Sequence, residues 1–188
     1  MTNTDVAIIG GGPAGLSAGL FTAKNGLDTI VFDTGETWMH KAHLYNYLGI
    51  RSMDGSVFQE RAREHAVTDH GAQLHEDEEV TGVEQNDDGF TVTSQEGEYD
   101  ADYIVLATGT HREFAESLDC EFTDQDVVDV DVTMETTVED VYATGAMIRV
   151  EEWQAIIAAG DGGSAALNIL SKEEGEHYHD FDTPEAPQ

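Results

Sequence analysis

The sequence predicts one α/β domain in which a parallel sheet is covered by helices. Two apolar runs, residues 5–9 and 28–32, flank a segment of small residues that opens with a glycine-rich turn. Two later apolar runs each end in Ala-Thr-Gly, at residues 107–109 and 143–145. Short buried-type strands that alternate with helical segments are typical of β-α-β units, whose strands lie parallel to one another.

The turn after the first strand, Gly10-Gly11-Gly12-Pro13-Ala14-Gly15, predicts nucleotide binding. Glycines permit a tight turn and let a diphosphate approach the backbone, and the N-terminus of the next helix offers free N–H groups and the positive end of its dipole. Asp33 ends the second strand, where an acid accepts hydrogen bonds from a ribose hydroxyl. The sequence has all the parts of such a unit in the expected order: strand, turn, helix, a stop at Gly26, second strand and acid.

The middle of the chain contains further strands and one helix. Residues 34–56 are irregular and rich in aromatic residues and histidine, and residues 57–70 carry an apolar stripe with helical spacing. Turn signals separate three short strands, which are expected at residues 79–84, 89–94 and 98–101. A separate buried strand is expected at residues 103–107, directly before the first Thr-Gly pair.

The last part of the chain returns to the sheet. The expected elements are a polar crossover at 110–125, a half-exposed strand at 126–134, a short buried strand at 141–143 and a helix of small residues at 154–170. Residues 1–171 are therefore expected to form the domain. The polar residues 172–188 are expected to form a mobile tail.

The charge of the chain is strongly negative, because 39 Asp and Glu face only 8 Lys and Arg, for a net charge of −31. Without a basic patch the chain is not expected to bind nucleic acid or an anionic membrane. It has no apolar run of about 18 residues, and no signal peptide is expected, because no basic region precedes an apolar stretch at its start. Self-repulsion of this size is screened at molar salt, which indicates the high-salt cytoplasm of a halophile. The single cysteine, Cys120, fits a reducing compartment.

With both Ala-Thr-Gly segments placed, the chain resembles the FAD domain of the thioredoxin reductase family, within the pyridine nucleotide–disulfide oxidoreductases. The resemblance extends to about residue 171. The segments that match the family are the turn at 10–15, Asp33, Asn46-Tyr47-Leu48-Gly49, Glu79-Val80, residues 103–109, Val141-Tyr142-Ala143-Thr144-Gly145 and Gln154-Ala155. It implies a three-layer FAD/NAD(P)-binding Rossmann-like fold, with helices on one face of a parallel sheet and a small antiparallel three-stranded layer on the other.

The resemblance also implies FAD as the cofactor and a homodimer as the assembly. The residues expected to bind the cofactor are Gly10, Gly12, Pro13, Ala14, Gly15, Asp33, Thr34, Asn46, Val80, Ala107, Thr108, Gly109, Gly145, Ala146, Trp153, Gln154 and Ala155. No catalytic residue is identified. Nor is a metal site expected, because the His177-Tyr178-His179-Asp180 run lies in the tail.

Three departures from the family pattern affect the predicted activity. The family inserts an NADPH-binding domain with a Cys-x-x-Cys pair between its two halves, where this chain has only residues 110–140. After the glycine that corresponds to Gly145, the family has an acid, whereas this chain has Ala146. The family's arginine is replaced by Trp153. We therefore expect a minimal flavoprotein oxidoreductase that receives electrons from a redox partner such as a ferredoxin, a separate reductase or a thiol protein, or from a transient donor. The alternatives are a non-catalytic flavin-binding module and an NAD(P)-binding domain.

Several side chains have both a functional and a structural interpretation. Trp38, His40, His43, Tyr45 and Trp153 either line the flavin or pack in a loop. His43 would be a proton donor on the first interpretation, and we favour the second, in which it is a solvated loop histidine. Cys120 is either a redox thiol or, as we favour, a small buried residue.

The charge leads to a prediction about salt. We expect the protein to lose its helical circular dichroism on dialysis from molar KCl into low-salt buffer, because unscreened carboxylates repel one another in the folded state. Unfolding should be reversed when KCl is restored. Undiminished stability at low salt would contradict the halophilic interpretation.

Overall fold

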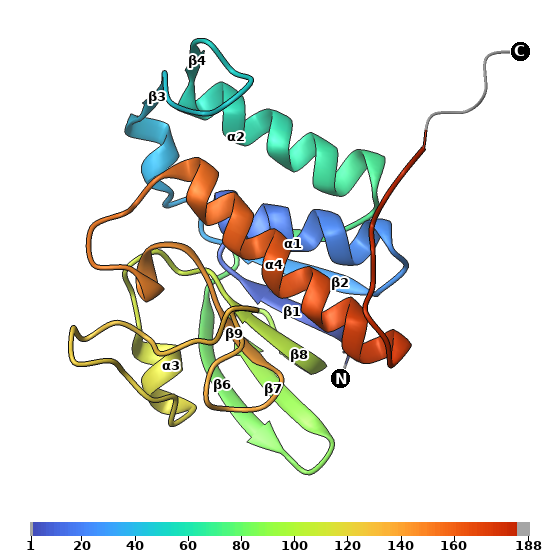
Figure 1. The fold of residues 1–188 in the computed structure, drawn as a ribbon. Coiled ribbons are helices and arrows are strands. Elements are labelled where there is room, and N and C mark those ends of the chain that lie inside the picture. Colours follow the sequence, from blue (N-terminus) through green and yellow to red (C-terminus); the bar gives the residue numbers. More distant parts are fainter. Residues whose placement is uncertain (1, 184–188) are drawn as a thin grey trace, which may run out of the picture.

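A computed structural model describes residues 2–183 and shows a branched, mainly parallel sheet covered by helices (Figure 1). The strand order is β5-β2-β1-β8-β7-β6, and β9 pairs with β8 beside this path. The strands of this sheet are β1 (Thr2–Ile9), β2 (Thr29–Asp33), β5 (Gln73–Glu76), β6 (Val80–Asn86), β7 (Gly89–Ser94), β8 (Glu98–Leu106) and β9 (Val141–Ala143). A two-stranded hairpin, β3 (His43–Leu44) and β4 (Met53–Asp54), stands apart from it.

The helices confirm the expected positions of the main helical segments. The α-helices are α1 (Pro13–Lys24), α2 (Gly55–Arg63), α3 (Glu113–Ser117) and α4 (Ala155–Glu174); the shorter turns are η1 (Trp38–Lys41), η2 (Glu64–Asp69) and η3 (Gly145–Ile148). Asp54 begins α2 by accepting a hydrogen bond from the Ser56 N–H at 2.9 Å. No helix in residues 2–183 is long and apolar enough to cross a bilayer.

The side chains of β1 show how the layers are built, because successive residues of a strand point to opposite faces. Val6 and Ile8 pack with Ala165 and Ile169 of α4, on the helical face. Ala7 and Ile9 pack on the other face, among the apolar side chains of β6 and β7. The predicted fold class is thus confirmed, with α1, α2 and α4 on one side of the sheet and the β6–β7 hairpin on the other (Figure 1).

One correction concerns β8, which was expected as two strands, 98–101 and 103–107. The structure has a single strand because its pairing with β1 keeps one register on both sides of Asp102, from Tyr99 opposite Thr2 to Leu106 opposite Ile9. Its first residues also pair antiparallel with β7, and its last residues pair parallel with β9. The expected antiparallel layer therefore shares its third strand with the central sheet.

A second correction concerns residues 126–134, where the alternation of Asp and Val wrongly predicted a strand. The segment makes only isolated bridges, Phe122 with Val128 and Val130 with Thr136. Asp131 accepts hydrogen bonds from the Thr133 and Glu135 N–H groups at 2.7 and 3.1 Å, and Met134 has a φ of +71°. These local bonds turn the chain before a strand can extend.

The end of the chain departs from the expected boundary at residue 171. Helix α4 runs on to Glu174 and ends at Gly175, whose φ is +70°. Beyond it, the Tyr178 hydroxyl donates to Asn25 at 2.7 Å, and Asp180 binds Lys24 at 2.5 Å. Residues 184–188 of the expected tail lie outside the described residues.

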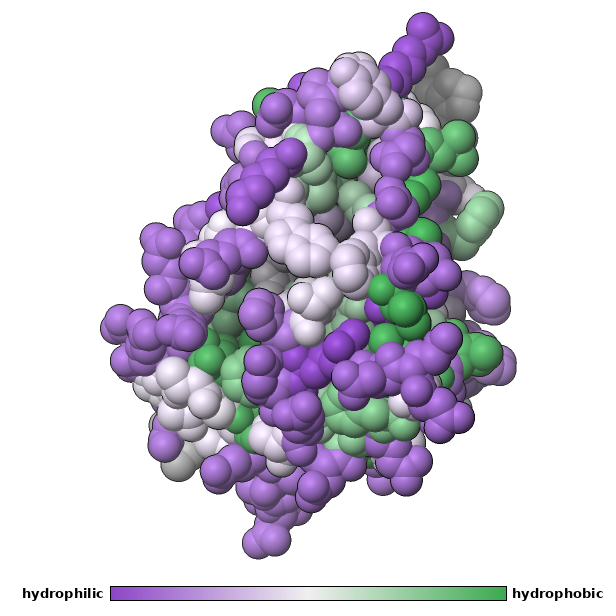
Figure 2. Space-filling view, turned by 90° about the vertical axis from the view of Figure 1, so that its left-hand side faces the viewer, coloured by the Kyte–Doolittle hydropathy of each residue, from purple (hydrophilic) through white to green (hydrophobic). Residues whose placement is uncertain are grey.

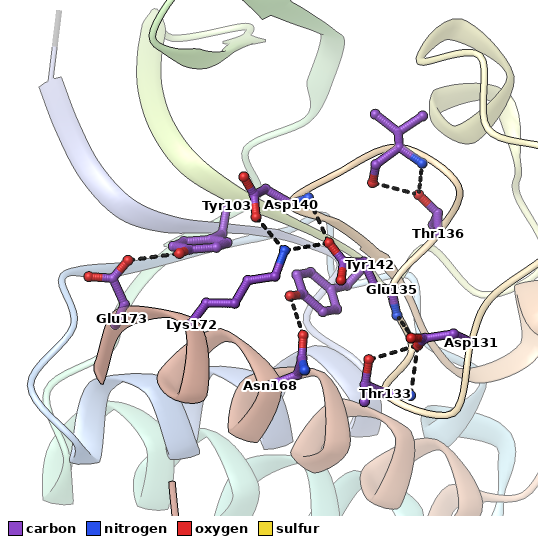
Figure 3. A network of polar contacts seen from close by, with 11 residues as sticks. Tyr103, Asp131, Thr133, Glu135, Thr136, Asp140, Tyr142, Asn168, Lys172 and Glu173 are labelled. Atoms are coloured by element: carbon purple, nitrogen blue, oxygen red, sulfur yellow. Dashed lines mark hydrogen bonds and ion pairs between the residues drawn. The ribbon is translucent and has the colours of Figure 1, made fainter. Parts of the chain in front are cut away.

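A polar network ties the C-terminal half of α4 to the segment before β9 (Figure 3). Lys172 Nζ lies 2.5 Å from Glu135 Oε1 and 2.7 Å from Asp140 Oδ1. The Tyr142 hydroxyl donates to Asn168 at 2.6 Å. Because one ammonium joins two carboxylates, its loss would leave two like charges side by side.

We expect Lys172→Met to lower the free energy of unfolding by about 1–2 kcal/mol, since the methionine keeps the apolar stem but leaves Glu135 and Asp140 without their cation. Lys41→Met is the control, because Lys41 makes no ion pair within residues 2–183; its effect should stay within about 0.5 kcal/mol. Thermal unfolding in molar KCl measures both. Equal effects of the two substitutions would show that the network adds nothing.

Candidate functional site

The turn between β1 and α1, together with the start of α1, has backbone without side chains at its glycines, and we call this segment, residues 10–15, the cradle. Gly10 has a φ of +114°, and a Cβ there would overlap the carbonyl oxygen of Ala107. A Cβ on Gly15 would overlap the carbonyl oxygen of Gly10. Both obstacles are backbone atoms, which cannot move aside as a flexible side chain can. The carboxyl ends of β1 and β8 therefore meet the start of α1 at this point.

The first turn of α1 offers unpaired N–H groups to a ligand. Gly12 is the N-cap and supplies no side-chain cap, and Pro13 occupies the first helical turn. A Cβ on Gly12 would meet only Thr37 Oγ1, at 3.7 Å, so the space beside it is open. The N–H groups of a first helical turn have no partner within the helix and attract anions. This geometry fits a diphosphate.

Asp33, the expected ribose-binding acid, lies at one side of the cradle and is bound to an arginine that the sequence did not reveal. Its Oδ1 accepts from the Gly35 N–H at 2.9 Å, and its Oδ2 lies 2.5 Å from Arg63 Nη2. Arg63 also reaches Glu76, at 2.8 Å. A Cβ on Gly11 would overlap the Asp33 carboxylate, so this carboxylate lines the turn directly. Thr34 follows at the exposed edge of the site.

Gln59 is the second side chain that α2 contributes to the cradle. Its Nε2 donates to the carbonyl oxygen of Gly11, and the residue is only 1% exposed. Gln59 Oε1 and Arg63 Nε are buried and have no partner within the described residues. Residues 59 and 63 share one helix face because they are four positions apart. The burial of two unpartnered polar atoms on this helix face is costly.

The two Ala-Thr-Gly segments meet at the same edge of the sheet. Thr144 donates to the carbonyl oxygen of Leu106 through its N–H at 3.0 Å and its hydroxyl at 2.9 Å, which joins the ends of β9 and β8. A Cβ on Gly145 would lie 3.5 Å from the Cβ of Ala14, in the first turn of α1. Of the expected cofactor-binding residues in these segments, Ala107 adjoins Gly10 and Gly145 adjoins Ala14.

The expected flavin end brings together two loops that are far apart in sequence. Asn46 Nδ2 donates to Gln154 Oε1 at 2.6 Å, and the rings of Trp38 and Trp153 lie 5.5 Å apart. Gln154 is the N-cap of α4, and Ala155 is its first residue. The face that carries these loops has weakly polar and apolar side chains gathered across its centre, among polar ones (Figure 2). Trp38 is 53% exposed and Trp153 is 45% exposed.

The expected adenine contact, Val80, is buried at the start of β6 beside a polar network. Glu78 accepts hydrogen bonds from Ser94 and from the Tyr99 hydroxyl, the latter at 2.8 Å, and lies 2.7 Å from His75 Nδ1. Burial alone would raise the pKa of Glu78, but these hydrogen bonds outweigh it and hold the pKa below its usual value. The Glu78 carboxylate thereby fixes the backbone next to Val80.

The other candidate side chains lie apart from a reactive centre. His43 is exposed and contacts Ser52 at 2.9 Å, as expected of a solvated loop histidine. Cys120 is 6% exposed, and its Sγ contacts Thr136 Oγ1 at 3.5 Å. Burial raises the pKa of the Cys120 thiol, which disfavours the reactive thiolate. His177–Asp180 pack toward α1 through Tyr178 and Asp180.

Comparison with known proteins agrees with this geometry. Residues 48–163 match a family described as pyridine nucleotide-disulphide oxidoreductase, and residues 3–71 match an FAD binding domain. A thioredoxin reductase of Treponema pallidum is 35% identical over 132 residues, which make up 64% of this chain and 40% of that protein. The chain therefore spans less than half of that relative's length.

Solved structures show the same fold at low sequence identity. A thioredoxin reductase from Gloeobacter violaceus has a TM-score of 0.88 and 19% identity, and the match covers 97% of this chain and 100% of that one. A ferredoxin-flavin thioredoxin reductase from Clostridium acetobutylicum has a TM-score of 0.78 and 19% identity, over 94% of this chain and 100% of that one.

The two glycines of the cradle should respond differently to a methyl group. We expect Gly10→Ala to destabilise the protein by about 3 kcal/mol, because a Cβ there is strained at positive φ and overlaps backbone. Gly12→Ala should change the free energy of unfolding by less than about 0.5 kcal/mol, since only Thr37 lies near. Thermal unfolding of the two variants in molar KCl tests the difference, and similar melting temperatures would contradict the geometry of the turn.

Proposed function

Because the chain belongs to the pyridine nucleotide-disulphide oxidoreductase family, we propose that it is an FAD-binding oxidoreductase domain of the thioredoxin reductase type. The observation that carries the proposal is the glycine cradle, in which bare backbone and a helix N-terminus lie together, with free room beside Gly12. A bound flavin supplies reversible transfer of one or two electrons, which no side chain of the site offers.

The residues divide between the two halves of the cofactor. On this proposal, the first turn of α1 with Gly10, Gly12, Pro13, Ala14 and Gly15 holds the diphosphate. Asp33 and Thr34 with Val80 form the adenosine side. The flavin side consists of Asn46, Ala107, Thr108, Gly109, Gly145, Ala146, Trp153, Gln154 and Ala155. The N-terminus of α4 at Gln154 presents its positive dipole end to that side, which would stabilise negative charge there.

We propose that electrons come from a redox partner or from a donor that binds transiently. Between β8 and β9 the described chain contains only α3 and turns, which leave no space for an inserted nucleotide-binding domain. The two exposed tryptophans lie at the flavin side, where a protein donor can approach. A ferredoxin, a separate reductase and a thiol protein are the candidate partners.

The second candidate is a flavin-binding module without catalytic activity. The observation that favours it is the state of Cys120, which is buried, has a raised pKa and has no second cysteine to pair with. A thiol–disulfide relay of the protein's own is therefore not supported. For either candidate function we propose a homodimer that works in a salt-rich cytoplasm. The family resemblance supports the homodimer, and the net charge of −31 supports the salt-rich cytoplasm.

The test is a visible absorption titration with FAD in molar KCl, followed by anaerobic addition of NADPH, reduced ferredoxin, dithiothreitol and finally dithionite. Bleaching of the bound flavin by one of the first three supports the oxidoreductase and identifies its donor class. Bleaching by dithionite alone supports the non-catalytic module.

Gly12→Ala is the variant that tests the binding site in the same titration. It should fold normally but bind FAD more weakly by about 10-fold or more, because the added methyl group occupies the space that the diphosphate needs. Failure of the unmodified protein to bind FAD would overturn the proposed function.

A further inference from the structure

A second buried aspartate, Asp161 of α4, lies at the Gly145 turn beside the cradle. It is 6% exposed, and its Oδ2 accepts from the Gly145 N–H at 3.3 Å. Neither the glycine motif nor the Ala-Thr-Gly segments pointed to this residue. It lies in the middle of a helix, where a buried carboxylate is costly unless it is paired.

The partner of Asp161 is Arg149, in the loop that follows η3. Arg149 Nη2 lies 2.5 Å from Asp161 Oδ1, and Arg149 Nε lies 3.2 Å from Asp161 Oδ2. Two parallel N–H···O contacts of this kind fix both the position and the orientation of the carboxylate. One carboxylate thus holds the Gly145 turn, the Arg149 loop and α4 together.

The pair lies beside the first turn of α1. A Cβ on Gly162, the residue after Asp161, would overlap the carbonyl oxygen of Ala14. A Cβ on Gly145 would lie 3.5 Å from the Cβ of the same alanine. Asp161 therefore adjoins the first turn of α1 through Gly145 and Gly162. An unneutralised carboxylate at this place would oppose a second anion, and burial would prevent salt from screening the repulsion.

The cradle is thus bounded by two aspartates, each bound to one arginine. Asp33 with Arg63 lines Gly11, and Asp161 with Arg149 holds Gly145. In both pairs the carboxylate side chain is less than one tenth exposed. The Arg63 guanidinium is shared between Asp33 and Glu76, so that side retains a net negative charge. Arg149 has a single acidic partner within the described residues, so its charge cancels that of Asp161 alone.

We propose that Arg149 is an affinity-determining residue for a diphosphate ligand: it neutralises Asp161 and so permits an anion to enter the cradle. This inference rests on the proposed function. It predicts that substitution of Arg149 and substitution of Asp161 change the ligand affinity in opposite directions. Removal of Arg149 leaves a buried negative charge near the ligand, whereas removal of the Asp161 charge leaves a positive one.

The test is a charge cycle read out as the dissociation constants of FAD and ADP in molar KCl. Arg149→Met should weaken binding of both ligands by about 10-fold or more. Asp161→Asn, which keeps an acceptor for the Gly145 N–H, should bind both as tightly as the unmodified protein or more tightly. The double variant should recover most of the affinity that Arg149→Met loses.

Lys24 and Asp180 provide a matched control pair. They also lie 2.5 Å apart, and the Asp180 side chain is 8% exposed like that of Asp161, but Lys24 is the last residue of α1. Lys24→Met should lower the melting temperature without changing either dissociation constant.

A structural role alone predicts a different pattern. Arg149→Met and Asp161→Asn would then weaken binding to the same extent. Alternatively, both variants would lower the melting temperature, and neither would change the dissociation constants. Either result, in a protein that binds FAD, would overturn the inference and leave the proposed function intact. If the unmodified protein binds neither ligand, the proposed function itself is wrong. If Arg149→Met does not fold, the sign of the Asp161→Asn effect decides, because weaker binding by that variant contradicts charge cancellation.

Discussion

The close approach of backbone to backbone at the ends of β1 and β8 is the constraint on which the rest of the structure depends. Gly10 meets the Ala107 carbonyl, Gly15 meets the Gly10 carbonyl, and Gly162 meets the Ala14 carbonyl. Each contact excludes a Cβ, so the backbones of α1 and α4 meet directly at Gly162, and α1 starts directly against the strand ends. The same contacts leave the first turn of α1 uncovered. Tight packing and an open anion site therefore have one cause.

Burial of acids is the second constraint, and it determines where the few cations lie. Of the eight lysines and arginines, four form ion pairs with Asp or Glu within residues 2–183: Lys24, Arg63, Arg149 and Lys172. Each of them meets at least one carboxylate that is no more than one fifth exposed. Most exposed carboxylates of residues 2–183 have no lysine or arginine partner, Glu76 and Asp182 being exceptions, which fits screening by salt in place of pairing by side chains.

The sequence predicted what depends on local pattern and missed what depends on tertiary pairing. The glycine turn, Asp33 and both Ala-Thr-Gly segments lie where expected, because positive φ and strand ends are local properties. Asp102 interrupted the apolar pattern of β8 and suggested a break, yet pairing with β1 continues past it. Arg63, Gln59, Arg149 and Asp161 show no sequence signal of their own, since each acquires its role from a partner on another element. Only the shared helix face of Gln59 and Arg63 could have suggested one.

The site's asymmetry bears on the way in which electrons would reach a flavin bound there. The adenosine side is closed by α2, whose Gln59 and Arg63 touch the cradle from within the protein. The opposite side ends in two exposed tryptophans and in the Asn46–Gln154 hydrogen bond, which joins two surface loops. Cys120 is buried against Thr136 and provides no relay. On the proposed function, a donor would approach across the tryptophan face, and a partner that does so must tolerate the acidic surface of a chain with a net charge of −31.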